Sequence, residues 1–342
     1  MIIDANVYWF PELLFREEDL MQQFLADIVK NKDMAAYVKT DKGKSQVVIE
    51  KPVGYPSVNY VQGEYNLDFM LSALREAKID KAVMKVPCCQ EWINLEMCRL
   101  FNNGMADYQK RSDGKLIALA VLPPFGSEES LGELDRCINH LGMHGIQLSA
   151  HYDGKYLDND IFTSLFEKLN ENEMTVYVHH TPLPVQYDPL CQYDNLRRTY
   201  GRCVDQMTAV SRELLSGMFR KYPNIKLVHS MLGGGFFTYI NMLLPPRLND
   251  TAKRFDTIDG QVCVWLEKNI FFEMSHAQPW GSPQLECAIK TMGADHIIYG
   301  SSFPVRQEWL SDGPNFVMAL NISEEDKVKI LSENAAKLYN IK

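Results

Sequence analysis

Short apolar segments recur along the chain and alternate with amphipathic ones. Each apolar segment ends at a glycine, a proline or a polar residue, which is typical of parallel strands buried on both faces. The segments between them repeat apolar residues at helical spacing. Alternating strands and helices indicate a parallel sheet, and eight repeats favour a closed (β/α)8 TIM barrel, formed as one α/β domain by residues 1–342. The predicted strands are residues 1–4, 81–86, 116–122, 145–149, 175–180, 225–229, 270–274 and 297–299.

The amphipathic segments predict the helices that would surround this barrel. An open doubly wound sheet is the alternative, but that fold usually carries a glycine-rich phosphate-binding turn after its first strand. No such turn follows residues 1–4. The predicted helices are residues 12–31, 67–77, 91–110, 128–140, 159–172, 205–221, 233–243, 259–268, 282–291 and 321–339.

Residues 33–65 interrupt the alternation. Lys42, Gly43 and Lys44 can turn a hairpin between residues 36–38 and 46–49. The remainder contains several prolines and glycines and is expected to be a loop. Because a long insertion after the first strand of a barrel usually forms a lid or a binding loop, we expect this insertion to cover the barrel mouth.

Charge and composition narrow the function classes. The formal net charge of -9 and the pI near 5.5 argue against nucleic acid or an anionic membrane as a partner. The sequence has neither a window of roughly 20 apolar residues nor the basic and apolar regions of a signal peptide. Its eight cysteines include no CxxC zinc pattern. We therefore expect a cytoplasmic protein with reduced thiols.

Several stretches carry a family resemblance, namely residues 135–137, 141–142, 145–148, 153–158, 216–219, 222–227, 231–237, 300–304 and 330–339. They are similar to the amidohydrolase-related family, in particular to aminocarboxymuconate-semialdehyde and hydroxybenzoate-type decarboxylases. The likeness covers nearly the whole chain from residue 66 onward, together with the first strand. It implies a barrel whose mouth acts on a small carboxylated cyclic or aromatic compound by decarboxylation or hydrolysis.

The resemblance also implies where a metal would bind. Family members hold a divalent ion through His-x-His on the first strand, a His on the fifth and an Asp after the eighth. Only the fifth-strand position is a histidine here, His179. The first pair falls on Asn6 and Tyr8, and the Asp falls on Ser302. The family's sixth-strand histidine falls on Met231.

Asn, Tyr and Ser are poor ligands for zinc or manganese. We therefore expect no metal and no other cofactor. The alternative is an ion held by unusual ligands, drawn from His179, His180, His229, Glu273 and the cysteines.

Without a metal, proton transfer would rest on side chains. His179 is the first candidate, because it ends a strand and an ordinary histidine titrates near neutral pH. His229 lies two residues before Met231 and is expected on the same side of the sixth strand. For both, the alternative is a structural histidine with its hydrogen bonds satisfied.

Lys85 lies in an otherwise apolar strand, where burying an ammonium is costly without a partner. We expect it to bind a substrate carboxylate or to act as a base with a lowered pKa, with Glu273 as its partner. The alternative is an outward lysine whose ammonium reaches solvent between helices.

Further residues are expected to bind the substrate. Asn6, Tyr8 and Ser302 would offer hydrogen bonds in the space of the lost ion. Arg197, in a loop after the fifth strand with Arg198 and Arg202, could grip a carboxylate through two hydrogen bonds. Trp309 follows the eighth strand. A solvated surface position is the alternative for each of these residues alone.

Cys88 and Cys89 follow the second strand at the mouth. Cys88 paired with His179 would form a nucleophile, and two buried, unreactive thiols are the alternative.

The main hypothesis is an enzyme, a metal-independent decarboxylase or hydrolase of a small carboxylated compound. Decarboxylation is favoured because it needs only protonation of a carbanion-like centre. A non-catalytic protein that binds a small molecule is the first alternative, and a metal-dependent hydrolase with atypical ligands is the second. Association into a homodimer through exposed helices is a further expectation.

Overall fold

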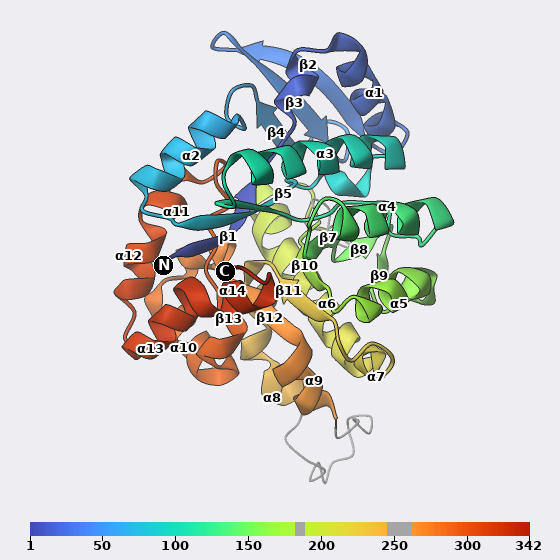
Figure 1. Ribbon diagram of the computed structural model, residues 1–342. Helices are drawn as coiled ribbons and strands as arrows, with labels where there is room; N and C mark the ends of the chain where they lie inside the picture. Colours follow the sequence, from blue (N-terminus) through green and yellow to red (C-terminus); the bar gives the residue numbers. More distant parts are fainter. Residues whose placement is uncertain (182–188, 245–260) are drawn as a thin grey trace.

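Eight parallel strands form the centre of the molecule (Figure 1). This computed structural model describes residues 1–181, 189–244 and 261–342. Each strand overlaps one of the predicted apolar segments, so the predicted strand pattern is confirmed, although β1 extends four residues beyond the predicted end at Asp4. The strands are β1 (Ile3–Tyr8), β5 (Lys81–Lys85), β6 (Leu116–Ala118), β7 (Gly145–Ser149), β10 (Thr175–His179), β11 (Lys226–His229), β12 (Ile270–Glu273) and β13 (Ile297–Ile298).

The strands close into a barrel. They pair in two runs, β1-β5-β6 and β13-β12-β11-β10-β7. At one join the Ala120 amide donates to the Gly145 carbonyl over 2.9 Å. At the other join the Ala5 amide donates to the Tyr299 carbonyl, also over 2.9 Å. The TIM-barrel prediction is therefore confirmed.

Alternate residues of the strands face the barrel interior. Val83, Tyr177 and Val228 belong to a small inner cluster, which Tyr339 also joins. Val178 belongs instead to the larger cluster between the strands and the helices. Because apolar side chains fill the barrel, a site can form only where the strands end.

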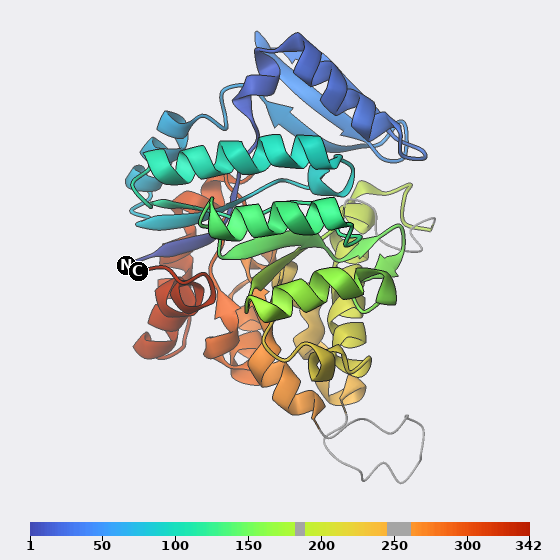
Figure 2. The same ribbon diagram turned by 45° about the vertical axis from the view of Figure 1, so that its right-hand side comes forward.

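Helices cover the outside of the barrel. Figures 1 and 2 show α3, α4 and α5 side by side on one flank, and they show the two termini next to each other. Side-chain oxygens of Asn66, Asn94, Ser127 and Ser323 cap four helix N-termini, as expected for these residue types. The helices are α1 (Glu18–Val29), α2 (Leu67–Glu76), α3 (Leu95–Arg111), α4 (Glu128–Asn139), α5 (Thr163–Glu171), α6 (Arg202–Leu215), α7 (Met218–Lys221), α8 (Ile240–Leu243), α9 (Val262–Asn269), α10 (Ser282–Met292), α11 (Gln307–Ser311), α12 (Gly313–Met318), α13 (Glu324–Val328) and α14 (Asn334–Leu338).

The predicted helix at 233–243 is largely wrong. Residues 231–235 all have positive φ and form tight turns, and only Ile240–Leu243 is α-helical. At Gly234 an added Cβ would lie 1.7 Å from the Cys203 carbonyl oxygen. Three consecutive glycines therefore serve a left-handed turn that packs closely on α6, and the apolar spacing alone could not reveal this.

The insertion forms a three-stranded antiparallel sheet from β2 (Ala35–Asp41), β3 (Lys44–Glu50) and β4 (Pro56–Val61). β2 and β3 are the expected hairpin. β4 corrects the expectation of a loop, because prolines and glycines flank a short alternating segment. In that segment Tyr60 is buried and stacks on Phe10, with ring centroids 4.0 Å apart.

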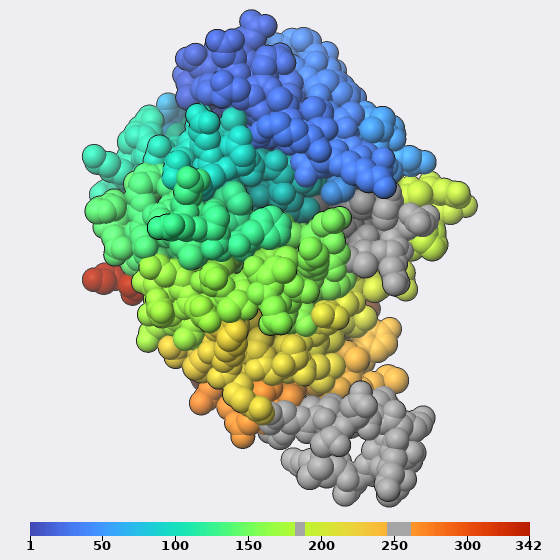
Figure 3. Space-filling view, turned by 90° about the vertical axis from the view of Figure 1, so that its right-hand side faces the viewer, coloured from blue at the N-terminus to red at the C-terminus, as the bar shows by residue number. Residues whose placement is uncertain are grey.

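This sheet touches loops at the C-terminal ends of two barrel strands. The Tyr60 hydroxyl donates to the Pro87 carbonyl, just after β5, over 2.6 Å. Arg197, in the connection after β10, donates to the Ser57 hydroxyl over 3.1 Å. In the space-filling view the sheet lies at one end of the molecule (Figure 3). No helix within the described ranges has the length and apolar character needed to cross a membrane.

Candidate active site

His179 ends β10 inside the barrel mouth and is fully buried. Its Nδ1 lies 2.6 Å from the His180 carbonyl oxygen, to which it can only donate. Its Nε2 is then an acceptor and lies 2.9 Å from the hydroxyl of Tyr8, at the end of β1. Burial, with Lys85 nearby, holds the pKa of His179 well below its ordinary value. The ring is therefore neutral at neutral pH, with one nitrogen lone pair facing Tyr8.

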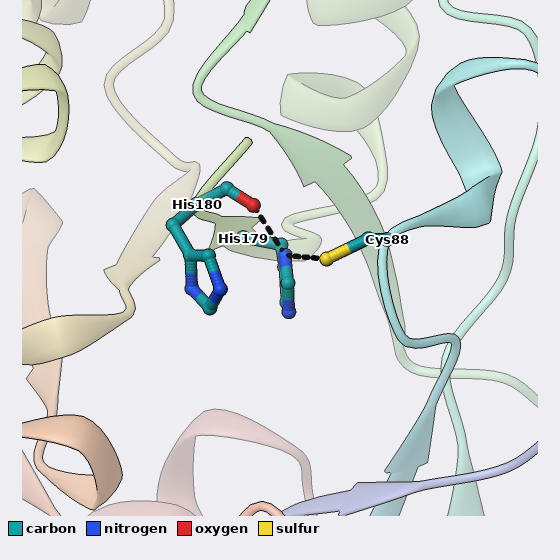
Figure 4. A group of neighbouring side chains, drawn as sticks. All are labelled: Cys88, His179 and His180. Atoms are coloured by element: carbon teal, nitrogen blue, oxygen red, sulfur yellow. Dashed lines mark hydrogen bonds between the residues drawn. The ribbon is translucent and has the colours of Figure 1, made fainter. Parts of the chain in front are cut away.

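Two further potential metal ligands surround this ring (Figure 4). The Cys88 sulfur lies 3.6 Å from His179 Nδ1, and the His180 ring stacks on the His179 ring with centroids 4.1 Å apart. One ligand atom from each of these three residues lies within 4.8 Å of the others. Cys88 has a φ of 72°, and this left-handed conformation at the loop start sets where its thiol lies. Burial raises the pKa of the Cys88 thiol to about 12.

Arg202 brings a positive charge to the same place. It begins α6 and is buried, with Nη1 3.4 Å from His180 Nε2. Its Nε has no hydrogen-bond partner, and no carboxylate within residues 1–181, 189–244 and 261–342 forms an ion pair with it. Burial lowers the pKa of Arg202, although a guanidinium stays charged at neutral pH. A buried cation with unused donors is suited to an anionic ligand.

His276 was missed by the sequence reasoning. It lies in the turn Ser275–Trp280, three residues after the end of β12. Its ring meets the His180 ring edge-on, with centroids 5.1 Å apart, and meets the Trp309 ring at the same distance. Trp309 therefore reaches the histidine group through His276. The rule that found His179, a polar residue just after a strand, would also have found His276.

Asn6, Ser302 and Glu273 come together as expected, but they bind one another. The Asn6 amide nitrogen lies 3.0 Å from the Glu273 carboxylate and 3.0 Å from the Ser302 hydroxyl. Glu273 also accepts hydrogen bonds from the Tyr177 hydroxyl and the Ser275 amide. The only buried side-chain atom of this described cluster that lacks a partner is Asn6 Oδ1. These residues therefore form a hydrogen-bonded network at the mouth, in which each side chain restricts the orientation of the others.

Lys85 points into the barrel. Its Nζ lies 3.1 Å from the centroid of the Tyr177 ring and donates to the Ala5 carbonyl over 3.2 Å. The alternative of an outward, solvated lysine is therefore wrong. The expected partner Glu273 forms no ion pair with it within the described chain, and Tyr177 lies between the two as their shared contact. Burial lowers the pKa of Lys85 well below its ordinary value.

His229 does not face the mouth. It pairs in register with the outward-facing Val178, and its ring nitrogens lie 2.7 Å from the Glu213 carboxylate and 3.0 Å from Gln206, both on α6. The expected alignment with Met231 is wrong, because Met231 lies beyond the strand at a φ of 55° and the two-residue period has ended.

Arg197 is buried but directed elsewhere. Its guanidinium donates to Ser57 of the insertion and to Asp194 of its own loop. Two of the Arg197 nitrogens are therefore occupied by hydrogen bonds within the protein. Arg202, five residues later, is the arginine that contacts a histidine of the mouth, His180.

Comparison with known proteins gives relatives of one chemical type. The chain is 24% identical over 253 residues to 2-amino-3-carboxymuconate-6-semialdehyde decarboxylase of Dictyostelium discoideum, covering 72% of this chain and 67% of that protein. It is 26% identical over 266 residues to gamma-resorcylate decarboxylase of Rhizobium radiobacter, covering 72% and 77%. The expectation of an enzyme of the carboxy-lyase type agrees with both names.

Solved structures with the same fold also bear decarboxylase names. A 5-carboxyvanillate decarboxylase from Novosphingobium aromaticivorans, crystallised with manganese and 4-hydroxy-3-methoxy-5-nitrobenzoic acid, superposes with a TM-score of 0.74 at 18% identity, over 99% of this chain and 96% of that chain. A dihydroxybenzoic acid decarboxylase from Polaromonas, with bound manganese and 2-nitroresorcinol, gives 0.70 at 17% identity, over 99% and 97%.

The expectation of a mouth without a metal site is wrong. Structural neighbours hold manganese, and Cys88, His179 and His180 form a group of potential ligands in this chain. The expectation gave most weight to the family's ligand positions and kept a site of His179, His180 and cysteines only as an alternative. It could not see that a loop after β5 brings a thiol next to two adjacent histidines. Two imidazoles and a thiolate suit a divalent ion of the zinc type, whereas manganese prefers carboxylate, carbonyl or water oxygens.

The family itself follows from a match over most of the sequence. The amidohydrolase family model matches residues 90–341, which include six of the eight barrel strands, all except β1 and β5. The resemblance carried by stretches such as residues 231–237 and 330–339 is thus confirmed: the chain belongs to the amidohydrolase family.

Proposed function

We propose that this protein is a decarboxylase of a small carboxylated aromatic compound. One observation carries the proposal: a buried arginine without an ion-pair partner among the described residues lies beside a tyrosine–histidine pair in the same barrel mouth. The names of the relatives support this reaction type. Ligands in two of the solved neighbours are substituted phenols, which supports an aromatic substrate.

Arg202 would hold the substrate carboxylate. Its Nε lacks a partner, and its Nη1 makes only a long contact with His180. Buried donors without acceptors are costly, so an incoming carboxylate would gain charge-assisted hydrogen bonds. Trp309 and His276 would offer ring faces and edges to an aromatic body.

His179 and Tyr8 would take part in protonating the ring carbon that loses carbon dioxide. When the bond to the carboxyl carbon breaks, its electron pair stays on the ring carbon, which must take up a proton as carbon dioxide leaves. The Tyr8 hydroxyl and His179 Nε2 share a proton over 2.9 Å. The Tyr8 hydroxyl would deliver its proton to the ring carbon. His179 Nε2 would hold that hydroxyl in place, as an acceptor in the metal-free mouth and as a donor when Nδ1 binds an ion. A divalent ion, when bound to Cys88, His179 and His180, would polarise a carboxylate or phenolate oxygen.

The insertion would close the mouth during the reaction. Tyr60 and Ser57 already contact the loops that follow β5 and β10. A covered mouth would exclude water and strengthen the electrostatic contacts of Arg202.

Substrate binding tests the role of Arg202 directly. Calorimetry with 2,6-dihydroxybenzoate should show that Arg202→Gln weakens binding by roughly 10- to 100-fold, because a charge-assisted hydrogen bond contributes about 1.5–3 kcal/mol. Arg198→Gln is the matched control, since Arg198 lies four residues away in the same segment but is exposed. Equal affinities of Arg202→Gln and the unaltered protein would contradict the proposed carboxylate contact.

A further inference from the structure

We infer that Cys88, His179 and His180 form a metal site that binds zinc. The Cys88 thiolate would make this site prefer zinc to manganese. The inference rests on the proposed function only in sharing its mouth, and its test needs no substrate. Neither Cys88 nor His180 occupies a position that the family resemblance assigns to a ligand.

The spacing of the donor atoms is suited to zinc. Zinc–sulfur bonds of about 2.3 Å and zinc–nitrogen bonds of about 2.1 Å, at a tetrahedral angle, separate the two ligand atoms by roughly 3.6 Å. The Cys88 sulfur and His179 Nδ1 are 3.6 Å apart. The ligand atoms of all three residues lie within 4.8 Å of one another, so a small adjustment of the third brings it into range.

The donor types favour zinc as well. Thiolate is a soft ligand and imidazole a borderline one, and both suit zinc better than manganese. Glu273, a buried carboxylate of the mouth, is occupied by hydrogen bonds from Asn6, Tyr177 and Ser275. No carboxylate belongs to the ligand group found in the described chain. The group therefore lacks the anionic oxygen that a manganese site normally uses.

Binding the ion requires two proton changes within the chain. The Cys88 thiol loses its proton to solvent as the sulfur–metal bond forms. His179 Nδ1 now donates to the His180 carbonyl, so its proton moves to Nε2 when Nδ1 becomes a ligand. The Tyr8 hydroxyl can accept there, because a hydroxyl both donates and accepts.

Charge explains why such a site would serve a carboxylate substrate. A dication with one thiolate keeps a net positive charge, and Arg202 adds another beside His180. Two cations in a buried mouth repel each other unless an anion joins them. A substrate carboxylate supplies that anion.

Metal competition in the absence of substrate tests the inference. Apoprotein would be titrated with zinc and with manganese against a coloured chelator. Zinc binds most nitrogen and sulfur sites more tightly than manganese, so the decisive quantity is how the ratio of the two affinities changes in variants. Cys88→Ser should weaken zinc binding by more than about 100-fold, beyond the usual loss from an outer hydrogen-bond partner, and should change manganese binding by less than about tenfold. Cys88→Asp should shift the ratio toward manganese.

Cys89→Ser is the matched control, because Cys89 is the adjacent thiol and is also buried. It should leave both affinities within about threefold of the unaltered protein. If Cys88→Ser fails to fold, the unaltered protein loaded with cobalt gives a second readout. A thiolate-to-cobalt charge-transfer band in the near ultraviolet is expected. Absence of zinc binding, a zinc affinity unchanged in Cys88→Ser, or a cobalt spectrum without that band would each overturn the inference.

Discussion

Burial sets the protonation states of individual residues in the barrel mouth. It lowers the pKa of His179 and of Lys85, and it raises the pKa of the Cys88 thiol to about 12. All three groups therefore favour their neutral forms when no ion is bound. Arg202 keeps its charge, because a guanidinium is hardly ever deprotonated in proteins. Among the described residues, Arg202 thus adds a fixed positive charge beside the neutral His179, Lys85 and Cys88 side chains, which is suited to binding an anion.

Asp4 provides a pH prediction at this scale. Burial raises its pKa from an ordinary 3.8 to about 7. Between these values the folded protein keeps a proton that the unfolded chain has released. The contribution of Asp4 to the free energy of unfolding is therefore fully present below pH 3.8 and falls as pH rises toward 7, by up to about 1.4 kcal/mol per pH unit.

Asp4→Asn should remove this decline. An asparagine oxygen can still accept from the Asn6 and Ser301 amides, which Asp4 Oδ1 holds at 2.9 Å. Urea unfolding at several pH values from 5 to 7 should show that the free energy of unfolding of the variant, relative to that of the unaltered protein, increases as the pH rises. Exposed Asp19→Asn serves as the control. Parallel pH profiles for Asp4→Asn and the unaltered protein would contradict the assignment.

The sequence predicted those site residues that end a strand. His179 was found in this way, because the C-terminal end of a barrel strand is known once the strand is known. Asn6 and Tyr8 were found through the family resemblance, and Lys85 through its place in an otherwise apolar strand. The sequence analysis named Cys88, His180 and Arg202 only within alternatives, and the structure shows that they lie together at the mouth. Their positions depend on a left-handed loop residue and on how α6 approaches β10, and neither can be derived from apolar spacing.

Among the secondary-structure elements, the segment after β13 packs closely against the end of β12 at Gly300. Gly300 lies against the Glu273 carboxylate, which in turn receives hydrogen bonds from Asn6 of β1. Three strands therefore meet at one residue without a side chain. This close approach explains why the eighth strand breaks at a glycine before its two serines.

Gly300→Ala should disturb this junction. The added Cβ would lie 2.2 Å from Glu273 Oε1 and 2.7 Å from Asn6 Cβ. Overpacking of this kind typically costs about 1–3 kcal/mol of stability, which chemical unfolding would measure. Gly132→Ala, on an open face of α4, should be neutral or stabilising by up to about 1 kcal/mol. Equal stability of Gly300→Ala and Gly132→Ala would show that the junction tolerates a side chain.

The inserted sheet depends on a small number of polar contacts with the barrel. Arg197 is fully buried and donates to Ser57 of β4. Arg197→Ala should loosen this contact, so hydrogen exchange at residues 56–61 should become faster by about tenfold for each 1.4 kcal/mol lost. Exposed Arg198→Ala should leave that exchange unchanged. Unchanged exchange in Arg197→Ala would mean that the aromatic stack of Phe10 and Tyr60 holds the sheet alone.

At the scale of the whole molecule, the barrel was predictable because each strand leaves a separate apolar segment in the sequence. Its closure follows from the number of segments and needs no particular residue. The insertion was less predictable, because prolines and glycines concealed β4. The metal site was mispredicted for a different reason. It combines His179 at the end of β10 with the adjacent His180 and with Cys88 from the loop after β5, and the family pattern includes only the first of these positions.

Carbon dioxide release tests the central claim most directly. The protein, supplied with zinc, would be given carboxyl-labelled aromatic acids that bind to it, beginning with 2,6-dihydroxybenzoate and 5-carboxyvanillate. We expect labelled carbon dioxide from at least one of these acids, and we expect its rate of release to fall at least about 100-fold in His179→Gln. Binding without any release, or release that His179→Gln leaves unchanged, would contradict a decarboxylase acting through this mouth.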